Sequence, residues 1–386
     1  MKYYLIAGEA SGDLHGANLM RALRRQDPGA QFRYWGGDAM KAVEGEPVRH
    51  IRDMAFMGFV EVLAHLPAVM DNIRFCKRDI LDWQPDVLVT IDYPGFNLKM
   101  ARHAHEHGIK TVHYISPQLW AWKAGRIKKL RRDLDKLCYI LPFEQKYYAD
   151  NRLPQAVYVG HPLLDCGIAD GSRQTDTLIA LLPGSRRQEI AKVFPAMLRL
   201  AKHHPEYEFQ VAGMTLLGEK FYQSVMERHG GNPGNVTILY DQTYQLLSTA
   251  HAAVVCSGTA TLETCLFNVP QVVGYIANPL SVAIARRIVA KRLKYISLVN
   301  LIADEPIVTE LIQEDLNDER LEKEFRRITV DEAARRHMLD GYARVHAILG
   351  NAGASDRTAQ EIILRPLSPF AKGEYPDGGR GSELET

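Results

Sequence analysis

The sequence predicts an α/β protein built from two doubly wound domains with parallel sheets. Strand-like apolar runs alternate with segments of helical period, this alternation restarts near the middle of the chain, and 386 residues suit two domains better than one. Parallel strands need crossover connections, which the helical segments would supply. We therefore expect two Rossmann-like units that face one another across a cleft at the carboxyl ends of their strands.

The first domain is expected over 1–168. It opens on a strand at 2–7, followed by a turn of Gly, Ser and Asp residues and a helix from about Leu14 to Arg25. Short apolar runs predict its other strands, which are placed at 31–35, 86–91, 110–115 and 137–141.

The pattern restarts in a second domain, expected over 169–345. A candidate linker at 165–175, rich in Gly, Asp and Ser, precedes it. Its first strand, at 177–182, leads through a Pro-Gly-Ser turn into a helix over 188–203. Its further strands are placed at 208–211, 236–239, 252–256 and 271–275.

The end of the chain is predicted to be helical and then unstructured. We expect a C-terminal helix over 346–365 that packs back on the first domain. The stretch 366–386 is rich in Pro, Gly and charged residues, which predicts a disordered tail.

Composition argues against several classes of partner and location. The formal net charge is +1, so no global field would hold the chain to nucleic acid. The five cysteines are scattered without a Cys-x-x-Cys pair, which indicates free thiols in a reducing compartment. The sequence has no secretory signal pattern and no run of about 20 apolar residues. We expect a cytoplasmic protein that binds no nucleic acid.

The turn after the first strand is a candidate ligand loop. Gly8 and Gly12 permit a tight turn, and the N-terminus of the following helix can bind an anion or a polar substrate. Glu9 and Asp13 flank Ser11, and two carboxylates in such a turn are costly unless they bind something. The alternative for Asp13 is a plain helix N-cap.

Asp92 directly follows the strand at 86–91, within Ile-Asp-Tyr-Pro-Gly-Phe-Asn. A carboxylate at the carboxyl end of a parallel strand is positioned to act on a ligand in the cleft. Asp92 is therefore a candidate general base for a substrate hydroxyl. The alternative is that it caps the turn made by Pro94 and Gly95.

Two strand-to-helix junctions in the second domain form a candidate site for a nucleotide diphosphate. The first contains Gly184, Ser185 and Arg186, where turn amides and a guanidinium would converge on a phosphate.

The second junction is Ser257-Gly258-Thr259, whose small residues let a diphosphate approach the positive end of a helix. Glu263, about one turn into that helix, is placed to accept hydrogen bonds from a ribose. Its alternative role is that of a favourable acid early in a helix.

Two segments combine apolar and basic residues in a way that suits a lipid surface. The stretch 55–69 is more hydrophobic than a surface loop should be, although core packing is an alternative for it. The stretch 284–294 mixes aliphatic residues with cations on a predicted helix, as interfacial helices on anionic lipid do. The residues proposed for membrane or acyl contact are Met57, Phe59, Val60, Val62, Leu63, Arg287 and Lys291.

Two patterns imitate metal ligands. His103, His105 and His107 are close in sequence, but helical spacing puts His105 on the opposite face from the other two. Asp133 and Asp135 lie in a basic helical run, which favours ion pairing at the surface. We expect no metal site and no cofactor.

These motifs, in this order, resemble those of the lipid-A-disaccharide synthase family, which are inverting glycosyltransferases of the GT-B superfamily. The resemblance runs from the first strand to about Ala359. The matching stretches are GEASGD at 8–13, MGFVEVL at 57–63, IDYPGFN at 91–97, HYISPQLWAW at 113–122, LPFE at 141–144, VGHPL at 159–163, LLPGSR at 181–186, SGTATLE at 257–263, VVGY at 272–275 and YISLVNL at 295–301.

The resemblance implies a specific reaction. UDP-2,3-diacylglucosamine would donate its sugar to the 6-hydroxyl of 2,3-diacylglucosamine 1-phosphate (lipid X). The products would be a β-1,6-linked disaccharide and UDP, with inversion at the anomeric carbon. GT-B enzymes generally need no metal, because cationic side chains and helix dipoles stabilise the leaving diphosphate.

The resemblance also implies roles for particular residues. Asp92 would be the general base, and Arg186 would hold the diphosphate together with the helix N-terminus at 257–259. Glu263 fits the ribose contact. Further matches to positions implicated in activity are Glu9, Ser11 and Asn300.

Two positions depart from the family pattern. Val299 stands where the family often has Pro, and Gly95 stands where it often has an acidic residue. Neither change removes a proposed catalytic group. We expect them to alter loop geometry or acyl selectivity.

Partners and location follow from the same resemblance. The first domain would bind the acceptor and lipid, and the second the UDP-sugar, with the enzyme attached peripherally to the cytoplasmic face of the inner membrane. Whether the chain forms a homodimer stays open. The alternatives are another UDP-sugar enzyme of this fold, such as a lipid-linked N-acetylglucosaminyl transferase or a UDP-sugar epimerase, and a catalytically silent lipid- or nucleotide-binding protein.

Overall fold

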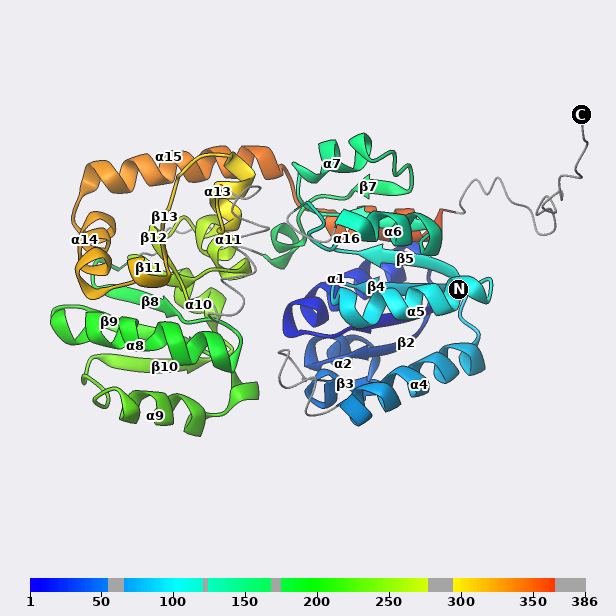
Figure 1. Cartoon of the computed structure of the whole chain (residues 1–386), viewed down its shortest axis with the longest axis horizontal. Coiled ribbons are helices and arrows are strands. Elements are labelled where there is room, and N and C mark those ends of the chain that lie inside the picture. Colours follow the sequence, from blue (N-terminus) through cyan, green and yellow to red (C-terminus); the bar gives the residue numbers. More distant parts are fainter. Residues whose placement is uncertain (55–65, 121–123, 168–174, 277–293, 365–386) are drawn as a thin grey trace, which may run out of the picture.

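The computed structural model describes residues 1–54, 66–120, 124–167, 175–276 and 294–364. Figure 1 shows two α/β domains side by side, each a sheet with helices packed around it. All strand pairs in both sheets are parallel, so the predicted class is confirmed.

The first sheet has seven strands in the order β3-β2-β1-β4-β5-β6-β7. Strand β4 is buried along its whole length because helices cover both faces of the sheet, which explains its unbroken apolar run. The strands are β1 Lys2–Ala7, β2 Gln31–Gly36, β3 Arg49–His50, β4 Val87–Ile91, β5 Lys110–Tyr114, β6 Lys136–Tyr139 and β7 Ala156–Tyr158. The helices among them are α1 Ala10–Gln26, α2 Asp38–Glu44, α4 Leu66–Trp83, α5 Pro94–Glu106, α6 Ile127–Asp133 and α7 Glu144–Asp150, with 3-10 turns η1 Ile51–Met54, η2 Ala124–Arg126 and η3 Pro162–Cys166.

The second sheet has six strands in the order β10-β9-β8-β11-β12-β13. The strands are β8 Leu178–Leu182, β9 Glu208–Gly213, β10 Val236–Tyr240, β11 Ala252–Cys256, β12 Gln271–Tyr275 and β13 Thr309–Ile312. Its helices are α8 Arg187–His203, α9 Glu219–Arg228, α10 Thr243–Leu247, α11 Thr259–Leu266, α13 Leu298–Ala303, α14 Asp318–Thr329 and α15 Glu332–Leu349, with 3-10 turns η4 Thr215–Leu217 and η5 Gln313–Asp315.

The last described helix, α16 Ala354–Ile363, returns to the first domain. In Figure 1 the chain runs along the second domain in α15 and then crosses to α16, which lies among the elements of the first domain. The α16 helix packs on α1, where Gln26 Nε2 donates to the Asp356 carbonyl at 3.0 Å. On its other side Glu361 pairs with Lys136 of β6 at 2.7 Å.

Several boundaries differ from those that the sequence predicts. Helix α1 begins at Ala10 rather than near Leu14, so Ser11, Gly12 and Asp13 lie inside its first turns. A Cβ at Gly16, one turn further along α1, would come within 2.6 Å of the Met40 Sδ, so glycine there allows the close packing of α1 on α2.

Three further strands, β3, β7 and β13, were not predicted because they have only two to four residues each. The stretch 346–365 contains the end of α15 and all of α16, separated by the turn at 350–353, so it is not one helix.

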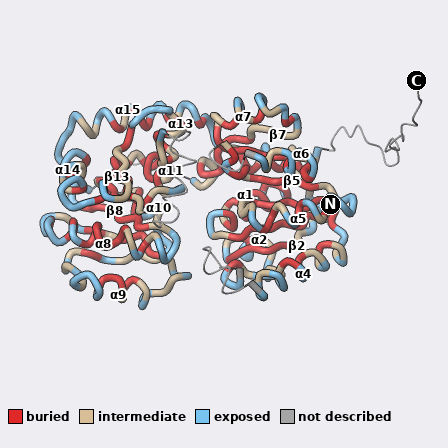
Figure 2. Tube along the Cα trace, viewed as in Figure 1, coloured by how far each residue is buried: buried red, intermediate tan, exposed pale blue. Residues whose placement is uncertain are grey.

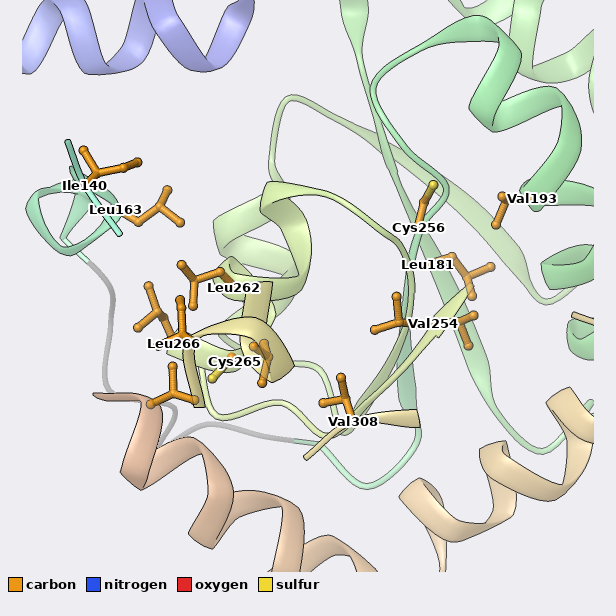
Figure 3. Packing of buried hydrophobic residues seen from close by; sticks show 14 of the residues in the cluster. Ile140, Leu163, Leu181, Val193, Val254, Cys256, Leu262, Cys265, Leu266 and Val308 are labelled. Carbon is orange, nitrogen blue, oxygen red and sulfur yellow. The ribbon is translucent and has the colours of Figure 1, made fainter. Parts of the chain in front are cut away.

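Buried residues follow the strands of both sheets (Figure 2). One apolar cluster includes residues of both domains. In Figure 3, Ile140 and Leu163 of the first domain lie on the side of α11 that carries Leu262 and Leu266. The two domains thus share packed apolar surface next to the crossing of the chain.

Within the described ranges, no helix combines the length and the hydropathy that a membrane span requires.

Candidate functional site

The predicted site residues lie at the switch points of the two sheets. The strand order reverses between β1 and β4 in the first sheet and between β8 and β11 in the second. Loops leave these neighbouring strands toward opposite faces, which opens a crevice where doubly wound sheets bind ligands. The first residues after these strands include Glu9, Asp92, Arg186 and Ser257.

The Asp92 loop has a strained backbone. Asp92 and Tyr93 both have φ of +46°, a left-handed conformation that is uncommon for residues other than glycine. The Asp92 amide donates to the Tyr114 carbonyl at 2.9 Å, and the Asn97 amide nitrogen donates to the Asp92 carbonyl at 2.7 Å. A side chain at Gly8 would overlap the Tyr93 ring. Asn97 and Gly8 therefore allow a conformation that turns Asp92 out of the strand.

The Asp92 carboxyl is half-buried, and its environment favours the protonated form. Burial, reinforced by the negative charge of Glu9, raises the pKa of Asp92 to about 6, while the Tyr93 amide and Arg186 act in the opposite direction. The pKa of Glu9 is also raised, again chiefly by burial. A carboxylate whose pKa lies just below neutral is well matched to accept a proton near pH 7.

An ion pair joins the two domains at this point. The Arg186 Nη2 lies 3.6 Å from the Glu9 Oε2, and the Arg186 Nη1 donates to the Glu189 Oε1 at 3.0 Å. Glu9 is the N-cap residue of α1, and Arg186 is the N-cap residue of α8. Two helix N-termini, a guanidinium and the Asp92 carboxyl thus meet in one place.

The loop after β8 is shaped by Gly184, which has φ of +116°. A Cβ there would come within 3.0 Å of the Glu189 side chain and 3.4 Å of the Cys256 Sγ. The β8 loop therefore packs closely on the end of β11 and requires glycine. Ser185 and Arg186 follow it as exposed residues.

The loop after β11 presents Gly258 and Thr259 at the surface, with Gly258 as the N-cap residue of α11. No protein atom lies within 4 Å of where a Gly258 Cβ would be. Ser257 is held from both sides. Its amide donates to the Gly274 carbonyl at 3.0 Å, and its Oγ donates to the Ile296 carbonyl at 3.2 Å.

Glu263 lies on α11, half-buried, and its Oε1 accepts a hydrogen bond from the Tyr244 hydroxyl at 3.2 Å. Burial raises the pKa of this carboxyl. Tyr244 is a polar neighbour that the sequence did not single out, because α10 has no recognisable motif.

Asp13 has a different position from the one predicted. It is buried inside α1, and its carboxylate accepts hydrogen bonds from the amides of Gly37 at 2.6 Å, Ala39 at 2.9 Å and Met40 at 3.1 Å. The side chain thereby caps the N-terminus of α2. Both of its oxygens accept hydrogen bonds from backbone amides. Ser11 is exposed on the first turn of α1.

Asn300 is not brought together with Asp92 by any described contact. It is 1% exposed, its Nδ2 donates to the Val308 carbonyl and to the Glu310 Oε1, both at 2.9 Å, and its Oδ1 accepts from the Val308 amide at 2.9 Å. The amide joins α13 to β13 through these contacts.

Glu144, in the LPFE stretch, is a buried acid beside the carboxyl ends of β5 and β6. Its carboxyl accepts from the Ser116 Oγ at 2.6 Å and from the Leu141 amide at 3.2 Å. Burial raises the pKa of Glu144 to about 7, although these hydrogen bonds act to lower it. The motif that contains it was visible in the sequence, but its role as an anchor for the Ser116 loop was not.

Some predicted residues lie outside the described ranges. These are the proposed membrane or acyl contacts Met57, Phe59, Val60, Val62, Leu63, Arg287 and Lys291. In the part of the chain that the structure describes, no three His, Cys, Asp or Glu side chains gather as metal ligands would.

A model of the lipid-A-disaccharide synthetase family matches residues 3–357. The chain belongs to this family. The lipid-A-disaccharide synthase of Geobacter sulfurreducens is 36% identical over 381 residues, which cover 94% of this chain and 96% of that protein. The corresponding protein of Chromohalobacter salexigens is 38% identical over 376 residues, with the same coverage of 94% and 96%.

Membership of the lipid-A-disaccharide synthase family makes the enzyme a glycosyltransferase of lipid A biosynthesis. Solved structures establish the fold. The UDP-GlcNAc 2-epimerase of Neisseria meningitidis bound to UDP-GlcNAc has a TM-score of 0.65 at 13% identity, covering 93% of this chain and 99% of that one. Acinetobacter baumannii MurG has a TM-score of 0.55 at 14% identity, covering 94% and 98%. At these identities the likeness supports the GT-B fold alone.

Proposed function

We propose that the enzyme transfers the sugar of UDP-2,3-diacylglucosamine to lipid X, with UDP as the second product. The observation that carries this proposal is the meeting of the loops after β1, β4 and β8. Arg186 of the second domain lies 3.6 Å from Glu9 of the first, and the Asp92 carboxyl is close enough to both for their charges to affect its pKa. An anion-binding group and a base therefore share one site.

Asp92 would act as the general base. Its ionised carboxylate accepts the proton of the acceptor 6-hydroxyl as the oxygen attacks the anomeric carbon. The new carbon–oxygen bond forms on the face opposite the UDP, and the bond to the diphosphate breaks, which gives inversion. Burial, together with the negative charge of Glu9, keeps the pKa of Asp92 high enough for the carboxylate to be a useful base.

The second domain would hold the leaving diphosphate. The Arg186 guanidinium and the exposed N-terminus of α11 at Gly258 and Thr259 offer positive charge and amide donors. In the free enzyme Arg186 is engaged by Glu9 and Glu189, and a diphosphate would replace these carboxylates. Glu263 would accept hydrogen bonds from the ribose hydroxyls.

Release of UDP from UDP-2,3-diacylglucosamine tests the reaction, measured with and without lipid X in detergent that contains a chelator. Release that depends on lipid X supports the transferase and its independence of metal. Release without lipid X would instead indicate an epimerase-like or hydrolytic activity. Failure to release UDP under either condition would contradict the proposed substrates.

We also propose peripheral attachment to the cytoplasmic face of the inner membrane, because both substrates carry acyl chains. Helix α4 supports this proposal. It exposes Met70 at 41% and Phe75 at 39%, and Arg74 and Arg78 are exposed on the same helix. Apolar and cationic side chains on one helix suit an anionic lipid surface.

Co-sedimentation with vesicles of phosphatidylethanolamine and phosphatidylglycerol tests the attachment. The variant Met70→Glu/Phe75→Glu should lose binding, and Ile348→Glu, at a residue of α15 that is 42% exposed, should keep it. Equal sedimentation of all three proteins, with folding intact, would contradict a role for α4.

A further inference from the structure

Glu310 of β13 gathers an unusual number of hydrogen-bond donors. Its carboxylate accepts from the Ile296 amide at 3.0 Å, from the Ser297 amide at 2.9 Å, from the Ser297 Oγ at 2.7 Å and from the Asn300 Nδ2 at 2.9 Å. All four donors belong to the segment that leads into α13 or to α13 itself. The carboxylate thus fixes that segment to the edge strand of the second sheet.

The chemistry of these contacts favours a carboxylate. The donors are neutral groups, and Ser297 and Asn300 are buried at 0% and 1% exposure. A carboxylate has only acceptor sites, and hydrogen bonds to an ionised acceptor are stronger than those between neutral groups. Glutamine with its oxygen in place of Oε1 would turn its N–H group toward the Ile296 amide, which now donates to Oε2 at 3.0 Å and to Oε1 at 3.2 Å, and would lose the shorter of these two bonds.

The segment before α13 that Glu310 holds also contacts the candidate diphosphate loop at 257–259. The Ile296 carbonyl accepts the hydrogen bond of the Ser257 Oγ at 3.2 Å, and the Ser257 amide is held by Gly274 of β12 at 3.0 Å. In the β12–β13 ladder, Glu310 pairs with Val273, next to Gly274. A short chain of contacts therefore runs from Glu310 through Ile296 to Ser257 at the start of the loop before α11.

We infer that Glu310 is a positioning residue for the diphosphate loop, through the contact of Ile296 with Ser257. This inference rests on the proposed function, because it takes the loop at 257–259 as a binding element for UDP. It also gives Asn300 a role: its amide completes the donor set of Glu310 and ties α13 to Val308. A buried residue can thus affect activity without contact with either substrate.

The test is the binding of UDP by isothermal titration, together with the steady-state KM of each substrate. Glu310→Gln should weaken UDP binding by about tenfold, because small misplacements of a binding group are costly. It should raise the KM of the UDP-sugar and leave the KM of lipid X unchanged. The matched control is Glu324→Gln, since Glu324 accepts from the Thr309 Oγ1 at 2.8 Å on the neighbouring residue of β13 and should leave both unchanged.

A double-mutant cycle separates positioning from a general loss of stability. If Glu310 acts through Ser257, the effect of Glu310→Gln on UDP binding should largely disappear in a Ser257→Ala background. Additive effects of the two substitutions, or UDP binding by folded Glu310→Gln within twofold of the wild type, would overturn the inference. Should Glu310→Gln not fold, Ser297→Ala removes one contact of the carboxylate together with the N-cap of α13, and should weaken UDP binding by about threefold on the same reasoning. Wild-type protein that binds no UDP would overturn the proposed function itself, a result distinct from equal binding by both proteins.

Discussion

At the residue scale, the surroundings of a carboxylate decide what it does. Asp13 and Asp92 are both acids near the carboxyl ends of central strands, and the sequence marks both as ligand candidates. Asp13 is bound by three backbone amides at the start of α2. Asp92 lies in a strained turn beside Glu9, and burial raises its pKa to about 6. Only the second environment favours proton transfer.

Asp92→Asn should lower kcat by about 10²–10⁴-fold, the usual contribution of a general base. In the wild type, kcat/KM for the acceptor should fall as the pH drops below about 6, because protonated Asp92 cannot accept a proton. A pH–rate profile measures this. A profile that is flat from pH 5 to 8 would contradict the assignment of Asp92 as the base.

The same substitution should raise the Tm at pH 8. The pKa of Asp92 in the folded chain is above its usual value of 3.8, so ionisation destabilises the fold. The stabilisation of the fold by protonated Asp92 is fully present below about pH 3.8. It is lost as the pH rises through about 6, where the carboxyl of the folded chain ionises. Thermal unfolding of the wild type and Asp92→Asn at pH 8 tests this, and a lower Tm for the variant would contradict it.

Asp13→Ala should destabilise the protein by about 2–3 kcal/mol, since it leaves buried donors at the start of α2 without their charged acceptor. The folded variant should keep the UDP affinity of the wild type, because Asp13 has no place in the proposed site. Denaturant unfolding and UDP titration measure the two effects. If the variant kept its stability but lost UDP binding, Asp13 would instead be a residue of the ligand site.

At the element scale, α16 shows how contacts remote in sequence hold a helix. The carboxylate of Asp165, which precedes the second domain, accepts from the amides of Gly353 at 2.6 Å, Ala354 at 3.2 Å and Ser355 at 2.7 Å. It satisfies amides that no residue of the helix itself can satisfy. Asp165, in the segment that leads into the second domain, therefore anchors α16, the helix that follows the second domain in the chain.

Asp165→Ala should speed hydrogen exchange of the amides in α16 and leave α15 unchanged, because the loss of the cap weakens the docking of α16 by about 1–2 kcal/mol. Asp356→Ala, which removes an exposed pair with Arg25 at 2.6 Å and a first-turn acid of α16 but no amide cap, is the control and should have a smaller effect. Equal exchange in α16 of the wild type and Asp165→Ala would show that the cap contributes little.

At the scale of the whole molecule, the described parts of the domains meet through apolar packing beside α11 and through the ion pair of Arg186 with Glu9 in the site. The Arg186 side chain is 51% exposed, so its pair with Glu9 is weak enough for a diphosphate to displace. In the free enzyme the positive charge of Arg186 lowers the pKa of Glu9 and of Asp92. A bound diphosphate would neutralise that charge and would therefore raise the pKa of both acids. Donor binding and the proton affinity of the base are thereby coupled.

Glu9→Gln should tighten UDP binding by about two- to fivefold, because it removes a carboxylate that competes for Arg186. The gain should shrink at high salt. Asp318→Asn removes a similarly exposed pair with Arg199, at 2.8 Å, and serves as the control. Weaker UDP binding by folded Glu9→Gln would mean that Glu9 supports the diphosphate site instead of competing with the ligand.

The sequence by itself determined the fold class, the central strands and the family. Long apolar runs mark buried parallel strands because helices cover both faces, and glycine-rich turns follow them at fixed places. Local patterns could not reveal the start of α1 at Ala10, because the glycines and polar residues of the first turns are typical of a loop. Short strands such as β13 also lack a pattern long enough to detect.

Only the tertiary structure decided which polar residues form the site. Asp13 and Asn300 are held by backbone groups from other elements, whereas Glu9 and Arg186 come from different domains and meet. The donors around Glu310 lie 10 to 14 residues before it, in and before the helix α13. Hydrogen bonds, burial and charge between residues far apart in sequence set these roles, and no local pattern carries that information.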